Sequence, residues 1–375
     1  MYETEFKLST ITPMYMHMYK NDTDQSYLEL RPSEFKGMIR FWWRALKAND
    51  NILQLKKEEE KIFGGITENS GRSAVLLKIT EQESNNSPIH PHLTLDSHYN
   101  RDEHRLEGKD VPISYLLYTV QKYPYYFSSF SLSIYSKDEK PLKNALAGLW
   151  CAINLGGFGS RSRRGGGSLK VEEVNGETYG LTFKPEEENS EEISQWIIEN
   201  TKKARSLVEK AGTQCSSYSN LSTAEFIISK NSFKTWQEAL KDVGKVYMDF
   251  RIPLKKQIQL GNFGLPIVHR SDGTIIKAKY TEKHINRKKE KRINRRASPL
   301  LFKILQNQNN FHWMALKFAG DIFPREAELV WSKKEKNSRD LPPQEIILEE
   351  QNPQQKIIDD FWNSLKAKNP SYKFF

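Results

Sequence analysis

The segment from Gly156 to Gly167 places six glycines and three arginines within twelve residues. Glycine permits positive φ and close approach of the backbone to a ligand, and the planar arginine side chain offers donors that fit phosphate. This composition predicts a mobile basic loop that wraps a polyanion. The alternative is a linker without a ligand, although linkers rarely carry arginines between their glycines. The glycines predicted to let the backbone approach the ligand are Gly156, Gly157, Gly159, Gly165, Gly166 and Gly167.

The sequence on either side of this loop restricts the fold. Residues 141–155 begin with proline and are followed by glycine, a pattern typical of a helix. Residues 168–174 have the composition of a strand. A helix–loop–strand unit is not a phosphate-binding P-loop, which runs strand–loop–helix and ends in Gly-Lys-Ser/Thr. Neither that motif nor Gly-x-Gly-x-x-Gly occurs in the chain.

Alternating and helical hydrophobic patterns recur through the first half of the chain. Strands are predicted at residues 4–12, 73–80, 126–135 and 168–174, and helices at 33–47 and 141–155. The order strand–helix–strand–strand–helix–strand is that of a ferredoxin-like domain. The polar residues 81–110 are expected to form a loop.

The second half of the chain also mixes helices and strands. Helices are predicted at residues 193–211, 233–246 and 356–366, and strands at 225–229, 266–269, 299–305 and 312–318. We therefore expect an α+β fold for the whole chain.

The composition indicates a polyanionic partner. The 375 residues suffice for two domains of ordinary size, and 57 basic against 47 acidic side chains give a net charge of +10. Such an excess favours nucleic acid, with a membrane surface as the competing interpretation. No stretch approaches the ~18 apolar residues that span a bilayer, and a signal-peptide pattern is absent. Two cysteines without metal-like spacing fit a reducing, cytoplasmic location.

The predicted helix at 33–47 is amphipathic. Ser33 is its expected N-cap, and its apolar positions are Phe35, Met38, Ile39, Trp42 and Leu46. Its cations, predicted to contact phosphates, are Lys36, Arg40 and Arg44, with Lys47 behind them. A solvated or subunit-facing surface is the alternative. Arg31 precedes the helix where the dipole favours an anion, and Trp43 either stacks on a base or, as we favour, packs in the core.

A second basic segment spans residues 277–296, with ten lysines and arginines against two glutamates. Runs of this density are often disordered arms or RNA-contacting segments. The alternative is a solvated loop without a partner. The candidate RNA contacts here are Lys288, Arg292, Arg295 and Arg296.

Two groups of residues raise the question of catalysis or metal binding. His90, His92, His98 and His104 lie within fifteen residues, and imidazole is a common zinc ligand. Their spacing matches no standard site, so a polar loop is favoured and no cofactor is expected. His17, Asp22 and Asp24 lie between the predicted first strand and first helix. A histidine such as His17 can act as a general acid or base in catalysis.

Several of these segments together resemble the RAMP superfamily, the RNA-binding subunits of CRISPR effector complexes. The resemblance is greatest to the first-numbered subunit of the type III-B (Cmr) module. It rests on Thr12-Pro13, Leu30–Arg44 with its Arg-Phe-Trp-Trp-Arg run, Ile62–Gly65, Gly156–Leu169, Gly264–Ile267 and Arg295–Leu300. One departure is that Met14–Met18 follows Thr-Pro, where members often carry small, glycine-containing residues.

The resemblance implies two ferredoxin-like (RRM-like) domains, which we expect at residues 1–180 and 181–375. It also implies a non-catalytic, cytoplasmic subunit of a ribonucleoprotein in antiviral defence. Such a subunit helps hold CRISPR RNA and captured target RNA near the 3′ end of the guide, beside other RAMP subunits. The arginines of the glycine-rich loop, Arg161, Arg163 and Arg164, are then the first candidates for RNA phosphate contacts.

Two other functions stay open from the sequence. The first is a RAMP-type endoribonuclease that uses Asp22 or Asp24, as the RNA-cleaving backbone subunits of the superfamily use an aspartate in the corresponding loop, or that uses His17. The second is an assembly subunit whose tryptophan-rich helix and glycine-rich loop contact only neighbouring subunits.

Overall fold

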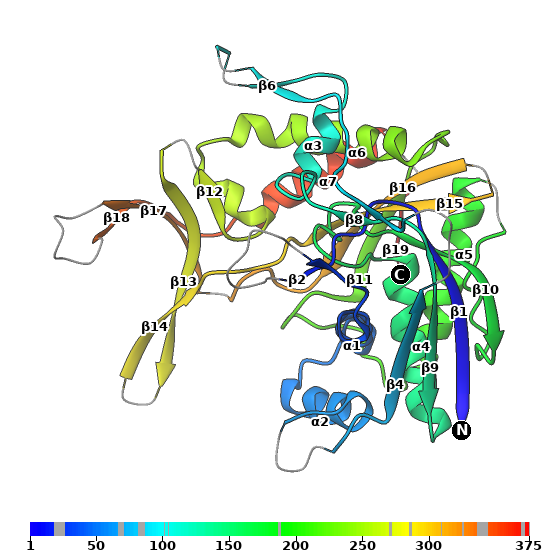
Figure 1. Cartoon of the computed structure of the whole chain (residues 1–375). Coiled ribbons are helices and arrows are strands. Elements are labelled where there is room, and N and C mark those ends of the chain that lie inside the picture. Colours follow the sequence, from blue (N-terminus) through cyan, green and yellow to red (C-terminus); the bar gives the residue numbers. More distant parts are fainter. Residues whose placement is uncertain are drawn as a thin grey trace. The chain divides into compact units, whose positions relative to one another are not determined.

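The computed structural model describes residues 1–18, 27–66, 71–81, 87–100, 102–103, 105–186, 189–269, 272–284, 287–308, 310–324, 326–335, 344–368 and 372–374. The chain divides into two compact units, whose elements are labelled in Figure 1. Unit 1 comprises Met1–Lys245, Leu301–Ala319 and Asn369–Phe375, and unit 2 comprises Val246–Leu300 and Gly320–Lys368.

The first sheet of unit 1 has four antiparallel strands in the order β10–β1–β9–β4. Their bounds are β1 (Tyr2–Thr10), β4 (Val75–Glu81), β9 (Ser129–Ser136) and β10 (Leu169–Gly176). Figure 1 shows these strands running side by side. Because side chains alternate between the two faces of a strand, β1 buries Phe6 and Leu8. Phe6 lies opposite Leu132 of β9 and Val174 of β10, which fixes the register of the sheet.

Two long helices, α1 (Pro32–Lys47) and α4 (Glu139–Asn154), connect strands of this sheet. Gly148 of α4 allows the two helices to approach, since a Cβ there would lie 2.6 Å from the carbonyl oxygen of Ile39. The predicted apolar face of α1 is buried, apart from the half-buried Met38. The predicted N-cap was wrong: Arg31 occupies that position, because Pro32 already has helical geometry and is tolerated at the first turn.

Aromatic side chains fill much of the core of unit 1. Six of them, each less than 2% exposed, are Phe35, Trp42, Trp43, Phe130, Trp150 and Phe158. The ring of Phe35 stacks on that of Phe158 with 4.5 Å between centroids, and its edge contact to Phe130 spans 5.5 Å. Phe158 belongs to the glycine-rich loop, so the loop is anchored in the core.

A second sheet of unit 1 has the strand order β15–β16–β11–β19. Its strands are β11 (Asn220–Ile228), β15 (Leu300–Asn307), β16 (Asn310–Ala319) and β19 (Tyr372–Phe374). The helices before and after β11 are α5 (Ser190–Leu207) and α6 (Trp236–Arg251). All the helices and strands that the sequence predicts in this region are therefore present. The structure adds the short β19, which the sequence did not predict.

Several small elements lie between β1 and β9. They are β2 (His17–Met18), β3 (Tyr27–Leu28), α2 (Ile52–Phe63), β5 (Ile89–His90), β6 (His98–Asn100), β7 (Arg105–Glu107), α3 (Val111–Leu116) and β8 (Tyr125–Tyr126). The prediction of a plain loop at 81–110 was wrong, since β6 and β7 form a hairpin and β5 pairs with β8. The unpredicted α2 has local signals, because the Asn51 side chain caps it and Gly64 ends it.

Unit 2 contains a sheet in the order β12–β13–β17–β18, with β14 also paired to β13. Its elements are two 3-10 helices (Ile252–Leu254 and Ile258–Phe263), β12 (Ile267–His269), β13 (Thr274–His284), β14 (Arg287–Ile293), β17 (Glu328–Glu335), β18 (Gln344–Gln351) and α7 (Gln355–Lys368). The basic segment 277–296 is thus largely an antiparallel hairpin of β13 and β14 (Figure 1). Its described residues are therefore neither a disordered arm nor a loop, while its contact with RNA stays a prediction.

The α+β class is confirmed, with antiparallel pairing in both units. The predicted domain boundary between residues 180 and 181 stays a prediction. Within the described residues, no helix combines the length and the apolar character needed to cross a membrane.

Candidate functional site

The predicted glycine-rich loop, residues 156–167, joins α4 to β10 as a folded turn. The N–H of Phe158 donates to the carbonyl of Gly167 at 2.9 Å, which closes the loop at its base. The N–H of Gly166 donates to the carbonyl of Arg161 at 3.2 Å. The loop is therefore held by internal hydrogen bonds, in contrast to the mobile segment that its composition predicts.

The glycines of this loop approach the protein's own atoms closely. A Cβ on Gly167 would lie 1.8 Å from the carbonyl oxygen of Phe158, and φ of Gly167 is +63°, a region that side chains rarely adopt. A Cβ on Gly156 would lie 2.6 Å from Nε1 of Trp42. At the other four positions the nearest atoms belong to Gly166 (for Gly157), Tyr15 (for Gly159), Leu240 (for Gly165) and Ser160 (for Gly166). These glycines serve packing, and their approach to an RNA backbone stays a prediction.

Thr12 and Pro13 fix the loop to the end of β1. The Thr12 hydroxyl donates to the carbonyl of Gly165 at 2.7 Å and accepts from the N–H of Ser168 at 2.9 Å. The N–H of Gly167 donates to the carbonyl of Pro13 at 2.8 Å. Thr12 is fully buried, so its hydroxyl replaces water for both loop groups.

The loop also pairs with β15 of the second sheet in unit 1. The N–H of Phe302 donates to the carbonyl of Arg163 at 3.2 Å, and Arg164 forms an isolated parallel bridge with Phe302. Beyond the loop, the Ser168 hydroxyl accepts from the N–H of Ile304 at 3.1 Å. The loop is consequently bonded to strands that are distant in the sequence.

The three loop arginines are half-buried, and two of them, Arg163 and Arg164, lie over aromatic rings. The Arg163 guanidinium lies 4.9 Å from the ring centroid of Phe318 and 5.3 Å from that of Phe41, and Arg164 lies 5.8 Å from Phe302. Such cation–π contacts engage the face of a guanidinium, while its N–H donors lie in the plane. The rings therefore help to position Arg163 and Arg164, and Nη1 of Arg164 also donates to the carbonyl of Arg163 at 3.0 Å.

The cations of α1 are largely engaged within unit 1. Glu59 of α2 is 5% exposed, and its Oε1 lies 2.6 Å from Nε of Arg40 and 2.5 Å from Nη1 of Arg44. Both guanidinium groups thus share one carboxylate and bind α1 to α2. Because a shared buried partner offsets their charge, their predicted grip on successive phosphates stays a prediction.

The lysines of the same helix are held in other ways. Nζ of Lys47 is buried, lies 2.7 Å from Oε2 of Glu58, and donates to the carbonyl of Glu209 at 3.0 Å. Nζ of Lys36 donates to the carbonyl of Val75 at 3.1 Å. Burial, with a smaller contribution from Arg40, lowers the pKa of Lys36 below its usual value.

The entrance of α1 is occupied by an internal ion pair. Arg31 bonds to Glu34 in the first turn, so the position predicted for an anion has a carboxylate beside it. Trp43 is 1% exposed, and its Nε1 donates to Oδ1 of Asn144 at 2.6 Å. The preference for core packing of Trp43 over base stacking is therefore confirmed.

In unit 2, most candidate arginines of the basic segment have acidic or backbone partners. Nη1 of Arg292 lies 2.6 Å from Oε2 of Glu345. Nη2 of Arg296 donates to the carbonyl of Asp321 at 2.8 Å, and burial lowers its pKa. Arg295 is exposed and has no ion pair within the described chain. The side chain of Lys288 lies outside the described residues.

The residues considered for catalysis or metal binding are only partly described. Asp22, Asp24, His104 and the side chain of His17 lie outside the described residues. His90 stacks on Tyr125 with 5.1 Å between centroids, and Nε2 of His98 lies 3.7 Å from Oε2 of Glu107. In the part of the chain that the structure describes, no three histidine, cysteine, aspartate or glutamate side chains are grouped to hold a metal ion.

One buried cation was missed from the sequence. Lys303 lies on β15 with a side chain that is 0% exposed, and its Nζ donates to the carbonyl of Leu169 at a long 3.4 Å. Burial lowers the pKa of this lysine to about 7. Its neighbours Pro299–Ile304 are mostly apolar, which marks a buried strand, but nothing local identifies the lysine as buried.

Known proteins are similar to this chain over much of its length. The model of the RAMP superfamily matches residues 7–170. The CRISPR system Cmr subunit Cmr1-2 of Pyrococcus furiosus is 35% identical over 191 residues, which are 46% of this chain and 96% of that protein. Cmr1-1 of the same organism is 26% identical over 348 residues, which are 86% and 89% of the two chains.

A solved structure agrees with this assignment at the level of the fold. The crystal structure of Cmr1 from Pyrococcus furiosus in its apo form has a TM-score of 0.61 at 22% identity, and the match covers 100% of this chain and 98% of that chain. The sequence similarity shows that the chain belongs to the RAMP superfamily and, within it, to the Cmr1 subunits of the type III-B CRISPR system.

Proposed function

We propose that this protein is a non-catalytic RNA-binding subunit of a cytoplasmic type III-B effector complex. It helps hold CRISPR RNA and captured target RNA near the 3′ end of the guide, beside other RAMP subunits. Guide–target base pairing reads the sequence, as in other RNA-guided systems, while this subunit contributes backbone contacts.

The topology supports two ferredoxin-like domains. The first series of elements in chain order is β1, α1, β4, β9, α4 and β10. Its four strands form a sheet with the order β10–β1–β9–β4. The later elements β11, α6, β15, β16, α7 and β19 repeat this scheme, since their strands have the equivalent order β19–β11–β16–β15. Both series follow the strand–helix–strand–strand–helix–strand pattern of that fold. The second series is interrupted by the strands of unit 2.

The observation that carries the RNA-binding proposal is the set of three half-buried arginines on the folded loop. Arg163 and Arg164 are positioned by aromatic rings, so less side-chain entropy is lost when a phosphate binds. The net charge of +10 favours the approach of a polyanion. Lys36, Arg40 and Arg44 of α1 are secondary candidates, because Arg40 and Arg44 share the buried Glu59 carboxylate and Lys36 donates to a backbone carbonyl.

The non-catalytic assignment rests on the family. The two Pyrococcus furiosus relatives are named as subunits, without a catalytic activity in their names. The rival endoribonuclease would use Asp22, Asp24 or His17. Its activity is an outcome of the experiment that follows.

The test is the binding of single-stranded RNA to the purified full-length protein across a salt series, with and without Mg²⁺ and Mn²⁺. We expect intact RNA to be bound with an affinity that falls steeply with salt, by about 0.7 in logarithmic slope for each phosphate contact. Metal-dependent cleavage that is lost in Asp22→Ala or Asp24→Ala, or cleavage lost in His17→Ala, would establish the rival enzyme. Salt-independent binding or no binding would favour the assembly subunit and contradict the proposal.

A further inference from the structure

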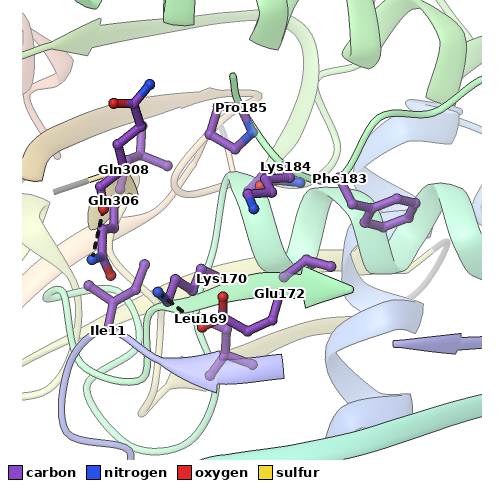
Figure 2. A pocket seen from close by; sticks show the side chains of 12 residues that line it. Ile11, Leu169, Lys170, Glu172, Phe183, Lys184, Pro185, Gln306 and Gln308 are labelled. Atoms are coloured by element: carbon purple, nitrogen blue, oxygen red, sulfur yellow. Dashed lines mark hydrogen bonds and ion pairs between the residues drawn. The ribbon is translucent and has the colours of Figure 1, made fainter. Parts of the chain in front are cut away.

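A pocket of ≈ 200 Å³ opens in unit 1 beside the strand that follows the glycine-rich loop, and Figure 2 shows its lining side chains. Its apolar walls come from the end of β1, from β10 and β15, and from the segment after β10. The apolar lining residues are Ile11, Leu169, Val171, Phe183, Pro185 and Leu305. This volume is below the roughly 300–1,000 Å³ of sites for drug-sized ligands, so it fits a single flat ring system.

Amide side chains line the same space. Figure 2 shows Gln306 and Gln308 together at one side, where Nε2 of Gln306 donates to the carbonyl of Gln308 at 3.4 Å. Asn154, the last residue of α4, also lines the pocket and is 4% exposed. Nδ2 of Asn154 has no hydrogen-bond partner within the described chain. A buried amide without a partner is costly, so a ligand group that accepts from Nδ2 of Asn154 would be stabilised here.

The charged residues that line the pocket are Lys170, Glu172 and Lys184, and only the first two form an ion pair with each other. Nζ of Lys170 lies 3.0 Å from Oε1 of Glu172, which also accepts from the Ser9 hydroxyl at 2.5 Å. Burial opposes ionisation of Glu172, but Ser9 and Lys170 outweigh it and hold its pKa below the usual value. Lys184 is exposed and has no ion pair in the part of the chain that the structure describes. The charge of Lys184 also helps to lower the pKa of Glu172, and its exposed side chain can approach an anion from solvent.

We propose that this pocket holds one unpaired base of a single-stranded RNA, with Lys184 beside the phosphate of that nucleotide. The amides of Asn154, Gln306 and Gln308 offer donors and acceptors to the edge of the base, and the apolar walls cover its faces. Sequence-tolerant and sequence-reading RNA sites both use splayed bases in this way. The inference rests on the proposed RNA-binding function for the polymer, but the pocket itself is tested with a single nucleotide.

The first experiment compares the affinity of full-length protein for a uridine 15-mer and for an abasic ribose-phosphate oligomer of equal length. We expect the wild-type protein to favour the intact RNA by about tenfold or more. The double variant Gln306→Ala/Gln308→Ala should lower this ratio by about fivefold and leave the salt slope unchanged. Lys184→Ala should lower the slope by about 0.7. Its matched control is Lys78→Ala, an exposed lysine on β4 at the opposite edge of the same sheet.

A further variant, Asn154→Leu, separates a role of Asn154 in binding from a role in stability. Because it replaces a buried, unpartnered amide by an apolar side chain of similar size, its Tm should be equal to or higher than that of the wild-type protein. Its preference for RNA with bases should be lost. A lowered Tm with an unchanged base preference would overturn the role of Asn154 in the pocket.

Uridine monophosphate, followed by NMR, distinguishes the pocket from the proposed function. Wild-type binding of this nucleotide that is lost in the pocket variants supports the pocket, even if the protein fails to bind RNA polymers. Normal RNA binding with an unchanged base preference in every variant overturns the pocket and leaves the proposed function standing. Variants that bind both ligands normally but lose a neighbouring RAMP subunit would show that a protein occupies the pocket, which also overturns the inference.

Discussion

The glycine-rich loop of unit 1 and the β13–β14 hairpin of unit 2 are both basic segments, yet they hold their charges in different ways. In the loop, glycines are packed against buried atoms and the guanidinium groups of Arg163 and Arg164 lie over aromatic rings. In the hairpin, charged side chains of the paired strands meet carboxylates of β18, as in the pairs of Arg292 with Glu345 and of Lys279 with Glu350.

The difference teaches that a count of positive charges does not identify a binding surface. Aromatic rings position the guanidinium groups of Arg163 and Arg164, which lowers the side-chain entropy lost when an anion binds, whereas Arg292 would have to give up its pair with Glu345. The loop is therefore the stronger candidate for phosphate contacts. The hairpin gains register and solubility from the same residue types, since opposite charges on neighbouring strands favour pairing.

The largest expected effect is at a loop glycine. Gly167→Ala should lower the free energy of unfolding by about 4 kcal/mol, because a Cβ would meet the Phe158 carbonyl at 1.8 Å in a backbone with φ of +63°. Gly273, in the turn before β13, has φ of +72° and open space around its Cβ position. Gly273→Ala should cost only about 1 kcal/mol. Denaturant unfolding checks both variants, and equal losses would contradict the packed loop.

The second prediction concerns the buried cation next to the loop. Burial lowers the pKa of Lys303 to about 7, while the pKa of a lysine in an unfolded chain is about 10.4. The unfolded state therefore binds more protons between these values, so the free energy of unfolding rises with pH by up to about 1.4 kcal/mol per unit. Lys303→Met should be more stable than the wild-type protein by about 3 kcal/mol at pH 8, with a gain that shrinks toward pH 10.

Unfolding curves at pH 7, 8 and 9 measure this difference. Lys317→Met is the control, because Nζ of Lys317 lies 2.5 Å from a carboxylate oxygen of Glu225 and is not isolated from a counter-charge. The control shows how the same replacement affects the unfolding curves at a lysine that has a counter-charge. If the free energy of unfolding had the same pH dependence in Lys303→Met as in the wild-type protein, the lowered pKa of Lys303 would be refuted.

A third, smaller effect is expected at the anchor of the loop. Thr12→Val removes the hydroxyl that joins the Gly165 carbonyl to the Ser168 N–H, and should cost about 2 kcal/mol. Thr10→Val is a matched control, since the Thr10 hydroxyl makes only a 3.4 Å bond to the Ser128 carbonyl. Its cost should stay below about 1 kcal/mol. Thermal unfolding ranks the two variants, and a reversed order would remove Thr12 as the anchor.

The smallest expected effect is in the basic segment of unit 2. Arg295→Ala removes an exposed guanidinium, so the free energy of unfolding should change by less than about 0.5 kcal/mol. Its RNA affinity should fall by less than about threefold. In Arg163→Ala both stability and RNA affinity should fall, since the side chain also packs on Phe41 and Phe318. A larger RNA effect at Arg295 would reverse the comparison of the two segments.

Much of the fold was readable because its patterns are local. The spacing of Phe35, Ile39, Trp42 and Leu46 predicts the buried face of α1, and alternation predicts β1 and β9. The hairpin was missed because its lysines and arginines resemble a disordered segment. Its signal is the alternation of Ile276 and Ala278, which are buried, with lysines. That pattern becomes convincing only with β17 beside it.

The candidate site was less predictable, because its contacts connect distant parts of the chain. The composition of the loop predicts arginines near an anion, but no local pattern shows that Gly156 packs on Trp42 or that Arg164 lies over Phe302. The sharing of Glu59 by Arg40 and Arg44 likewise depends on α2, an unpredicted helix. Partners for charged groups follow from tertiary structure, so the sequence identifies candidates without ranking them.

The most direct measurement is the affinity of single-stranded RNA for the triple variant Arg161→Ala/Arg163→Ala/Arg164→Ala at several salt concentrations. We expect at least about a tenfold loss, roughly 1.4 kcal/mol, and a smaller salt slope. The control is Lys78→Ala/Lys202→Ala/Lys203→Ala, which removes three exposed cations elsewhere in unit 1. A tenfold loss confined to the loop variant would support the loop as the RNA contact. Unchanged affinity in a loop variant that remains folded, or equal losses in both, would contradict it.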